Sequence, residues 1–353
     1  MKPFYLTTAI AYTNAEPHIG FALELVYADV LARYMRMTGR PVKFLTGTDE
    51  HGQKIAHKAD EVKKDAQVFV NEMAARVREL CDKLDISNDD FIQTTQERHK
   101  RSVAAFWNRV MEAGFIYKKP YAGLYCVGSE SFKTEKDLVD GMCPDHGTAP
   151  ERFEDENYFF KLTAFREKLQ VLYDERPDFV IPEAKFNEVK QLLASGLEDV
   201  SISRSRKVLE WGIPVPGDET QVVYVWFDAL VNYVSAIGYG RGKEDEMATY
   251  WPADVHIIGK EINRFHTVLW PAMLMAAGVE VPHQVGVHGW ITVDGKKMSK
   301  TVGNVLNPFD AIRHYGTEPL RYFLMREIPF YGDGDFSHAR FLDRYNGDLA
   351  NEL

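Results

Sequence analysis

Apolar positions in the first third of the chain alternate between short continuous runs and longer stretches with helical spacing. The run PFYLTTAIAY (residues 3–12) predicts a buried strand, and FALELVYADVLARYMRMTG (21–39) predicts a helix that stops at Gly39. VKFLTGTDEHG (42–52) predicts a second strand that breaks into a polar turn. Strands that alternate with helices in this way indicate parallel βαβ units.

The same alternation continues, breaks and returns. A long amphipathic stretch (62–84), a short strand near residues 91–92 and a helix over 97–114 come first. From residue 117 to residue 221 the composition changes: Tyr, Gly, Cys and Pro become frequent, together with many charged residues. Apolar strand and helix patterns then resume. The sequence therefore predicts an α/β fold, a doubly wound parallel sheet interrupted by an inserted domain.

Composition limits the class of protein. The 353 residues are 45% hydrophobic and 27% charged, enough for a large core and for two or three domains. The net charge of −10 argues against a surface coated with basic residues for nucleic acid, although it allows local patches. Three cysteines fit a reducing compartment, and nothing in the sequence reads as a secretory signal or a membrane span, so we expect a cytoplasmic protein.

Two motifs stand where ligands meet an open parallel sheet, at the carboxyl ends of its strands. His18 and Gly20 of PHIG lie between the first strand and the first helix, where glycine permits close backbone approach and helix amides suit phosphate. Asp49 of GTDEHG follows the second strand. Taken separately, each motif is more often an ordinary turn than a ligand site.

A third motif carries more information. DGKKMSKTVGN (294–304) gathers three lysines, glycines and hydroxyl side chains in one loop of an acidic protein. A solvated lysine turn is the plain interpretation, but such a loop also suits the charge that develops on a departing pyrophosphate.

Together, PHIG and KMSKT resemble the two signature motifs of class I aminoacyl-tRNA synthetases, the HIGH and KMSKS motifs. AIAYTNAEPHIG, FLTGTDEHG, YVWFDALVNY, HIIGKEINRFH and GKKMSKTVGN, in this order, are similar to the methionyl-tRNA synthetase family of the short bacterial type. The resemblance covers essentially the whole chain. It implies a nucleotide-binding (Rossmann-like) catalytic domain and a ligase that joins methionine to tRNA.

The resemblance also implies roles for individual residues. The catalytic residues would be His18, Lys297 and Lys300. The residues expected at ATP are His18, Gly20, Gly259, Glu261, Lys297, Ser299 and Lys300. Those expected around methionine are Ile10, Tyr12, Asp49, Trp226, Ala229, Leu230, Tyr233, Ile262 and His266. Helical spacing would put Trp226, Ala229, Leu230 and Tyr233 on one face, and Ile262, His266 and Trp270 on another; a stripe of this kind is also what a plain core would show.

The change in composition and the family resemblance together predict the domain boundaries. Residues 1–116 and 222–293 form the two halves of the catalytic domain, and 117–221 form an inserted connective domain with a knuckle at 121–156. Residues 294–338 form the KMSKT loop and a stem-contact domain. Residues 339–353 begin a helical anticodon-binding domain that relatives continue, so we expect a catalytic fragment that activates methionine and charges tRNA poorly.

Two positions depart from the family pattern. Phe21 stands where the first motif usually has a second histidine, which removes one potential phosphate donor. In the knuckle, Cys126, Ser129, Cys143 and His146 stand where zinc-binding relatives have three cysteines and a histidine. A serine hydroxyl is a poor zinc ligand, so we expect no structural zinc; Asp145 as a substitute ligand remains the alternative.

The expected partners are L-methionine, ATP with Mg²⁺ and the acceptor stem of tRNA(Met), with no membrane and a monomeric chain. One alternative is a catalytically silent paralogue that binds RNA or acts as a scaffold, although His18, Asp49, Lys297 and Lys300 are all present. Another nucleotidylyltransferase would be shorter and would lack the YVWFDAL segment. A nicotinamide-dependent dehydrogenase would need G-x-G-x-x-G after its first strand, which this chain lacks.

Overall fold

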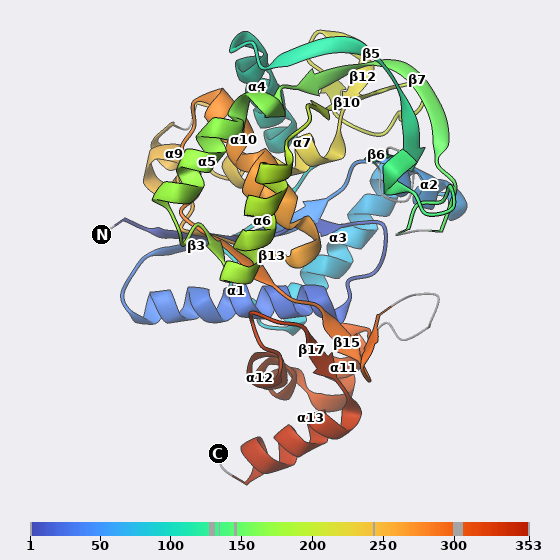
Figure 1. Ribbon diagram of the computed structural model, residues 1–353. Coiled ribbons are helices and arrows are strands. Elements are labelled where there is room, and N and C mark those ends of the chain that lie inside the picture. Colours follow the sequence, from blue (N-terminus) through green and yellow to red (C-terminus); the bar gives the residue numbers. More distant parts are fainter. Residues whose placement is uncertain are drawn as a thin grey trace.

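A parallel sheet forms the centre of the molecule (Figure 1). The computed structural model describes residues 2–126, 131–133, 135–144, 147–242, 244–298 and 306–351. The sheet has the order β2-β3-β1-β13-β14-β8, with β4 paired to β3, and every described pair in it is parallel. Its strands are β1 (Phe4–Thr8), β2 (Ala11–Tyr12), β3 (Val42–Asp49), β4 (Asp90–Gln93), β8 (Val180–Ile181), β13 (Val255–Gly259) and β14 (Val285–His288). The predicted doubly wound sheet is confirmed.

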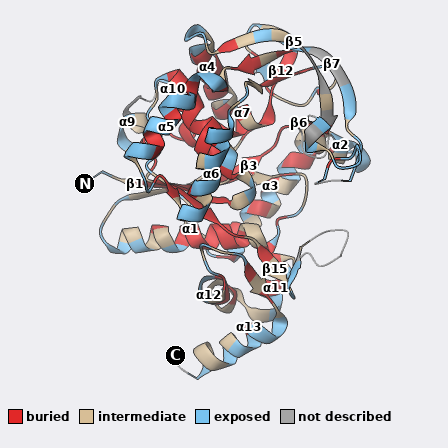
Figure 2. Cartoon of the chain, viewed as in Figure 1, coloured by how far each residue is buried: buried red, intermediate tan, exposed pale blue. Residues whose placement is uncertain are grey.

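Both faces of this sheet are covered, as its nearly continuous apolar strands require. Side chains alternate along β1, so Phe4 and Leu6 pack with helix α1 (Ile19–Met37), whereas Tyr5 joins the large core on the opposite face. In Figure 1, α1 lies below the strands while α5, α6 and α10 lie above them. Figure 2 shows buried residues along the strands and on the inner faces of these helices.

The helices begin and end close to the predicted positions, with one addition. The addition is helix α2, which the sequence pattern did not predict and which ends before Val62. The predicted amphipathic stretch 62–84 contains one helix, α3, which begins after residue 62 because Asp65 caps it. The helices outside the inserted region are α2 (Gln53–Glu61), α3 (Ala66–Lys83), α4 (Glu97–Glu112), α7 (Val225–Leu230), α8 (Asn232–Ser235), α9 (Glu244–Tyr250) and α10 (Trp270–Ala277). Among the described residues, no helix combines the length and apolar character needed to span a membrane.

The predicted insertion contains two small antiparallel sheets and part of the central one. One sheet has the order β6-β5-β7-β9 and the other β10-β12-β11. Their strands are β5 (Ile116–Cys126), β6 (Ser131–Lys133), β7 (Glu151–Phe160), β9 (Val200–Ser201), β10 (Ser203–Ser205), β11 (Pro214–Val215) and β12 (Asp218–Val223). Between β7 and β9, helices α5 (Arg166–Glu175) and α6 (Glu183–Ser195) flank β8, which pairs with β14. This stretch of the insertion therefore packs on the central sheet, and the domain boundaries themselves stay a prediction.

The last part of the chain forms a small unit below α1 (Figure 1). Its elements are β15 (Ile291–Val293), β16 (Lys296–Lys297), α11 (Pro308–Tyr315), α12 (Thr317–Glu327), β17 (Gly334–Phe336) and α13 (His338–Arg344). Arg321 of α12 reaches Asp29 of α1, with 2.6 Å between the Arg321 Nη2 and Asp29 Oδ2 atoms. The Asp29 side chain is fully buried and also accepts hydrogen bonds from Ser87, so this unit is joined to α1 and to the segment before β4.

Candidate active site

The site lies where the strand order of the sheet changes direction. Strands β1 and β13 are parallel neighbours at the centre of the sheet. The chain continues from β1 to β3 on one side of this pair, and from β13 to β14 on the other side. In open α/β sheets, ligands bind in the crevice beside such a switch point. A cavity of about 700 Å³ opens there, lined by residues 9–12 after β1 and by Glu261 and Ile262 after β13. Its volume suits a small organic ligand.

His18 is the N-cap of helix α1. Its backbone is extended (φ −108°, ψ 169°), and its Nδ1 atom accepts a hydrogen bond from the Phe21 amide at 3.3 Å. Because Nδ1 is the acceptor, the proton of a neutral His18 ring lies on Nε2, which can donate to an anion. A Cβ atom at Gly20 would lie only 3.0 Å from the Nδ1 and Cε1 atoms of His18, so glycine lets the imidazole fold over the first helical turn. Residues 18, 20 and 21 all line the cavity.

The cavity brings together all nine residues that the resemblance assigns to methionine. Ile10 lies between β1 and β2, Tyr12 ends β2 and Asp49 ends β3, and the parallel register places Tyr12 opposite Asp49. The remaining six come from α7, α8 and the segment after β13: Trp226, Ala229, Leu230, Tyr233, Ile262 and His266. The predicted single helix over 226–233 is two short ones, since α7 ends at Leu230, yet its residues still face one space.

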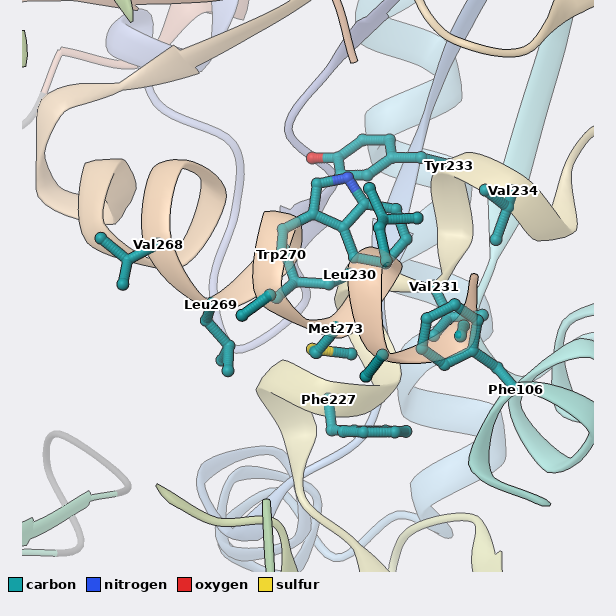
Figure 3. Packing of buried hydrophobic residues seen from close by; sticks show 14 of the residues in the cluster. Phe106, Phe227, Leu230, Val231, Tyr233, Val234, Val268, Leu269, Trp270 and Met273 are labelled. Carbon is teal, nitrogen blue, oxygen red and sulfur yellow. The ribbon is translucent and has the colours of Figure 1, made fainter. Parts of the chain in front are cut away.

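The second predicted helical face is wrong at Trp270. Residues Phe265–Leu269 form a π-helical turn, which contains more residues per turn than an α-helix, so a spacing of four no longer keeps side chains on one face. Ile262 and His266 line the cavity, but Trp270 is fully buried in the core behind it. Figure 3 shows Trp270 beside Tyr233 in this cluster, and the centres of their rings are 6.0 Å apart.

Proline explains the start of α10 after this turn. Pro271 has no backbone N–H, so the carbonyl of Thr267, four residues earlier, receives no helical hydrogen bond from it. The hydroxyl of Tyr173 on α5 donates to this carbonyl instead, at 2.6 Å. The irregular helix is therefore stabilised from the region of the predicted insertion.

The polar pair in the pocket wall is uncharged at neutral pH. His266 Nδ1 lies 3.0 Å from the Ile262 carbonyl oxygen, which can only accept, so Nδ1 carries the proton. Burial lowers the pKa of His266 to about 4, so its Nε2 atom carries no proton at neutral pH. This nitrogen accepts a hydrogen bond from the Tyr233 hydroxyl, 2.7 Å away. Burial also raises the pKa of Tyr233. The wall thus offers phenol oxygen lone pairs and aromatic surface without charge.

Trp226 closes another side of the pocket. Its ring lies parallel to that of Phe265, with 3.9 Å between the ring centres and 4° between the planes. His266 meets the Trp226 ring nearly at a right angle, at 6.4 Å. Such walls suit a polarizable, flexible side chain, which needs shape and ring contacts to be recognised.

Glu261 also lines the cavity and lies two residues after the end of β13. Its Oε2 atom accepts the indole N–H of Trp290 at 2.9 Å. A Cβ atom at Gly259 would lie 2.7 Å from Glu261 Oε1, so glycine makes room for this carboxylate. Gly259 is not part of the described cavity lining, whereas Glu261, Gly289 and Trp290 are.

The lysine loop is described only at its beginning. Lys297 lies in β16, where its backbone pairs with Thr292, and Met298 lines the cavity. Ser299 and Lys300 lie outside the described residues, so their predicted roles are untested.

The zinc prediction is also untested. Cys126 and Cys143 are buried, while Ser129, Asp145 and His146 lie outside the described residues. Within the described part of the chain, no three His, Cys, Asp or Glu side chains form a group that could hold a metal ion.

Sequence reasoning missed a buried acid and base in the cavity wall. Glu24 Oε2 lies 3.0 Å from His288 Nε2, and His288 Nδ1 donates to the Gly289 carbonyl at 2.8 Å. Burial raises the pKa of Glu24; burial also opposes the charge on His288, but the hydrogen bond and charge of Glu24 outweigh it and raise the pKa of the imidazole. The signal that could have revealed this site is a glutamate four residues after Gly20, within the apolar face of the first helix. Other lining residues missed from sequence are Asn14, Lys54, Asn232 and Trp290.

Comparison with known proteins finds relatives that match the whole chain. The family described as tRNA synthetases class I (M) matches residues 4–152 and 136–353. A methionine–tRNA ligase of Caldanaerobacter subterraneus is 48% identical over 352 residues, and one of Brucella suis is 47% identical over 356 residues. Each alignment covers 100% of this chain; it covers 55% of the Caldanaerobacter protein and 68% of the Brucella protein. The chain thus spans little more than half the length of the first of these relatives.

Solved structures show the same similarity in three dimensions. The methionyl-tRNA synthetase of Mycobacterium tuberculosis in complex with methionyl-adenylate superposes with a TM-score of 0.96 and is 43% identical, over 100% of this chain and 70% of that one. The free form of that enzyme gives a TM-score of 0.86. Sequence motifs, sheet topology and overall similarity agree, and the chain belongs to the methionyl (M) family of class I tRNA synthetases.

Proposed function

We propose that the protein containing this chain is a methionyl-tRNA synthetase: it activates L-methionine with ATP and transfers the methionyl group to tRNA(Met). The observation that carries the proposal is the convergence of the nine residues assigned to methionine, together with His18, Gly20 and Glu261, around one cavity beside the switch point. These residues come from segments far apart in the sequence. The relative in complex with methionyl-adenylate has nearly the same fold, which supports the same chemistry.

In this proposal the apolar wall selects the methionine side chain. The neutral Tyr233–His266 pair leaves the phenol oxygen available beside the thioether without the cost of a buried charge. Trp226 supplies a broad ring surface for the flexible chain. Asp49, 8% exposed in the cavity, would accept the substrate ammonium in a charge-assisted hydrogen bond.

The first step would be attack by a methionine carboxylate oxygen on the α-phosphorus of ATP. An oxygen–phosphorus bond forms, the bond from the α-phosphorus to the bridging oxygen of the β-phosphate breaks, and pyrophosphate leaves with that electron pair. No protein nucleophile or proton transfer is required, so the protein contributes positioning and stabilisation of charge. ATP would bring Mg²⁺ on its phosphates, where the metal neutralises part of that charge.

The roles toward ATP follow from the same arrangement. His18 Nε2–H would donate to a phosphate oxygen at the N-terminus of α1, where the helix amides favour an anion. Glu261 would accept from the ribose, while Lys297, Ser299 and Lys300 would approach the phosphates. In the second step a terminal ribose hydroxyl of tRNA attacks the methionyl carbonyl, the bond to AMP breaks, and the hydroxyl proton leaves with AMP or solvent.

The test is methionine-dependent exchange of pyrophosphate into ATP by the 353-residue chain. We expect exchange with methionine, none with leucine or valine, and large losses in His18→Ala and Lys300→Ala. Exchange would also show that Phe21 is compatible with activity. A folded chain that binds methionine but gives no exchange would favour the silent-paralogue alternative. Zinc measured on the same preparation would decide whether the knuckle binds metal.

A further inference from the structure

A fully buried carboxylate lies beside the pocket and is held by two histidines. Asp228 of α7 has its Oδ2 atom 2.7 Å from His51 Nδ1 and its Oδ1 atom 2.6 Å from His99 Nε2. A carboxylate can only accept, so both ring nitrogens donate. Burial acts to raise the pKa of Asp228, but the charges and hydrogen bonds of His51 and His99 outweigh it and hold the pKa at about 2. The group is therefore ionised at neutral pH.

A buried ion of this kind contributes little net stability, because desolvation cancels much of the attraction to its partners. What it does provide is fixed geometry between the groups bonded to it. The importance of Asp228 therefore lies in the segments that it holds together.

Asp228 connects two walls of the proposed methionine pocket. Its neighbours on α7, Trp226 and Ala229, line the cavity, and its bond reaches His51, two residues after Asp49. The described cavity lining includes Asp49 but not His51. Asp228 is therefore connected to the cavity indirectly, through the loop that begins at Asp49, the last residue of β3.

The other side of this loop is held by the region of the predicted insertion. The Trp211 ring packs on His51, with 5.5 Å between the ring centres, and its indole N–H donates to the Glu50 carbonyl at 2.6 Å. The Gly52 amide donates to the Trp211 carbonyl at 3.4 Å. Three consecutive residues of the loop are thus clamped between Trp211 and Asp228.

We propose that Asp228 is a positioning residue for amino-acid binding: through His51 it fixes the loop over residues 49–52 against α7, and so places the Asp49 carboxylate where the substrate ammonium must lie. The second branch runs through His99 of α4 to Ser235 of α8, 2.8 Å from His99 Nδ1, and so leads away from the turn after Asp49. The inference rests on the proposed function, because it assigns Asp49 to the ammonium of methionine.

The chemistry of the network predicts how two substitutions differ. In Asp228→Asn, the amide oxygen can still accept from His51. His99 can change tautomer, accept the new N–H₂ donor at Nε2 and donate from Nδ1 to Ser235 Oγ, now 2.8 Å away. The Ser235 hydroxyl can then donate to the Asn232 carbonyl, 3.1 Å away. Asparagine therefore preserves the clamp, whereas Asp228→Ala removes both of its bonds.

The experiment measures KM for methionine and for ATP separately by pyrophosphate exchange, and Kd for methionine by calorimetry. His51→Ala and His99→Ala are the matched pair, since both histidines are buried and both bind the same carboxylate. We expect Asp228→Ala and His51→Ala to raise KM and Kd for methionine about 10- to 100-fold, as loss of groups that orient binding residues does, with KM for ATP changed less than about threefold. Asp228→Asn and His99→Ala should keep methionine binding within about threefold, although His99→Ala should melt earlier.

Two results would overturn the inference: equal losses of methionine binding in His51→Ala and His99→Ala, or a parallel rise of KM for both substrates in His51→Ala. If Asp228→Ala fails to fold, the histidine pair still decides. If the unmutated chain binds methionine without exchange, the proposed catalytic function fails while calorimetry on the same variants still tests the positioning role. If the unmutated chain does not bind methionine, both fail.

Discussion

The neutral state of buried His266 should make the protein unstable in acid by an amount that the structure specifies. Burial lowers the pKa of His266 from 6.5 to about 4 in the folded protein. Between these two values the unfolded chain binds the proton and the folded chain does not, so acid favours unfolding. The contribution to stability is fully present above pH 6.5 and is lost progressively as the pH falls toward 4.

The magnitude follows from the difference between the two pKa values. Each unit corresponds to about 1.4 kcal/mol, so the full loss is roughly 3 kcal/mol, of which about 2 kcal/mol falls between pH 7 and pH 5. His266→Gln removes the titrating group while keeping an acceptor for the Tyr233 hydroxyl. Between pH 7 and pH 5 the free energy of unfolding should fall in both proteins. We expect the fall in His266→Gln to be about 2 kcal/mol smaller than the fall in the unmutated chain.

Urea unfolding followed by tryptophan fluorescence at pH 7 and pH 5 measures this difference directly. Burial is also the main cause that lowers the pKa of His256, and this part is common to both proteins; the smaller lowering caused by the charge of His266 is lost together with His266. Equal losses in the unmutated chain and in His266→Gln would refute the reasoning, because they would show that His266 binds its proton equally in both states.

Three further substitutions test other parts of the structure. Gly259→Ala places a Cβ atom 2.7 Å from Glu261 Oε1, so the carboxylate must move and KM for ATP should rise about tenfold while KM for methionine stays constant; a parallel rise of both would contradict this. Tyr173→Phe leaves the Thr267 carbonyl without its 2.6 Å donor and should cost about 1–2 kcal/mol in urea unfolding, whereas a neutral result would mean that water replaces the hydroxyl. Phe227→Ala removes a fully buried ring and should cost about 3–5 kcal/mol, and a loss below about 1 kcal/mol would show that the core collapses around the gap.

The sequence by itself determined the fold class and the edge of the sheet where the site lies. Alternation of apolar strands and amphipathic helices is a local signal, and parallel strands bring their carboxyl ends to one edge. Asp49 ends β3, and His18 and Glu261 follow two other strands, so their convergence could be expected once those strands were recognised. The family resemblance supplied the nine methionine residues, all of which line the cavity.

Only the tertiary structure decided the features that depend on contacts between distant segments. Glu24 and His288 are 264 residues apart, and Asp228 meets His51 across 177 residues, so neither pair leaves a mark in local spacing. The π-helical segment directs Trp270 into the core, and Tyr173, on a helix of the predicted insertion, stabilises this segment. Local patterns report which face of an element is apolar; which groups meet there is set by how the elements pack, because the energy of a buried polar group depends on partners that the fold brings to it.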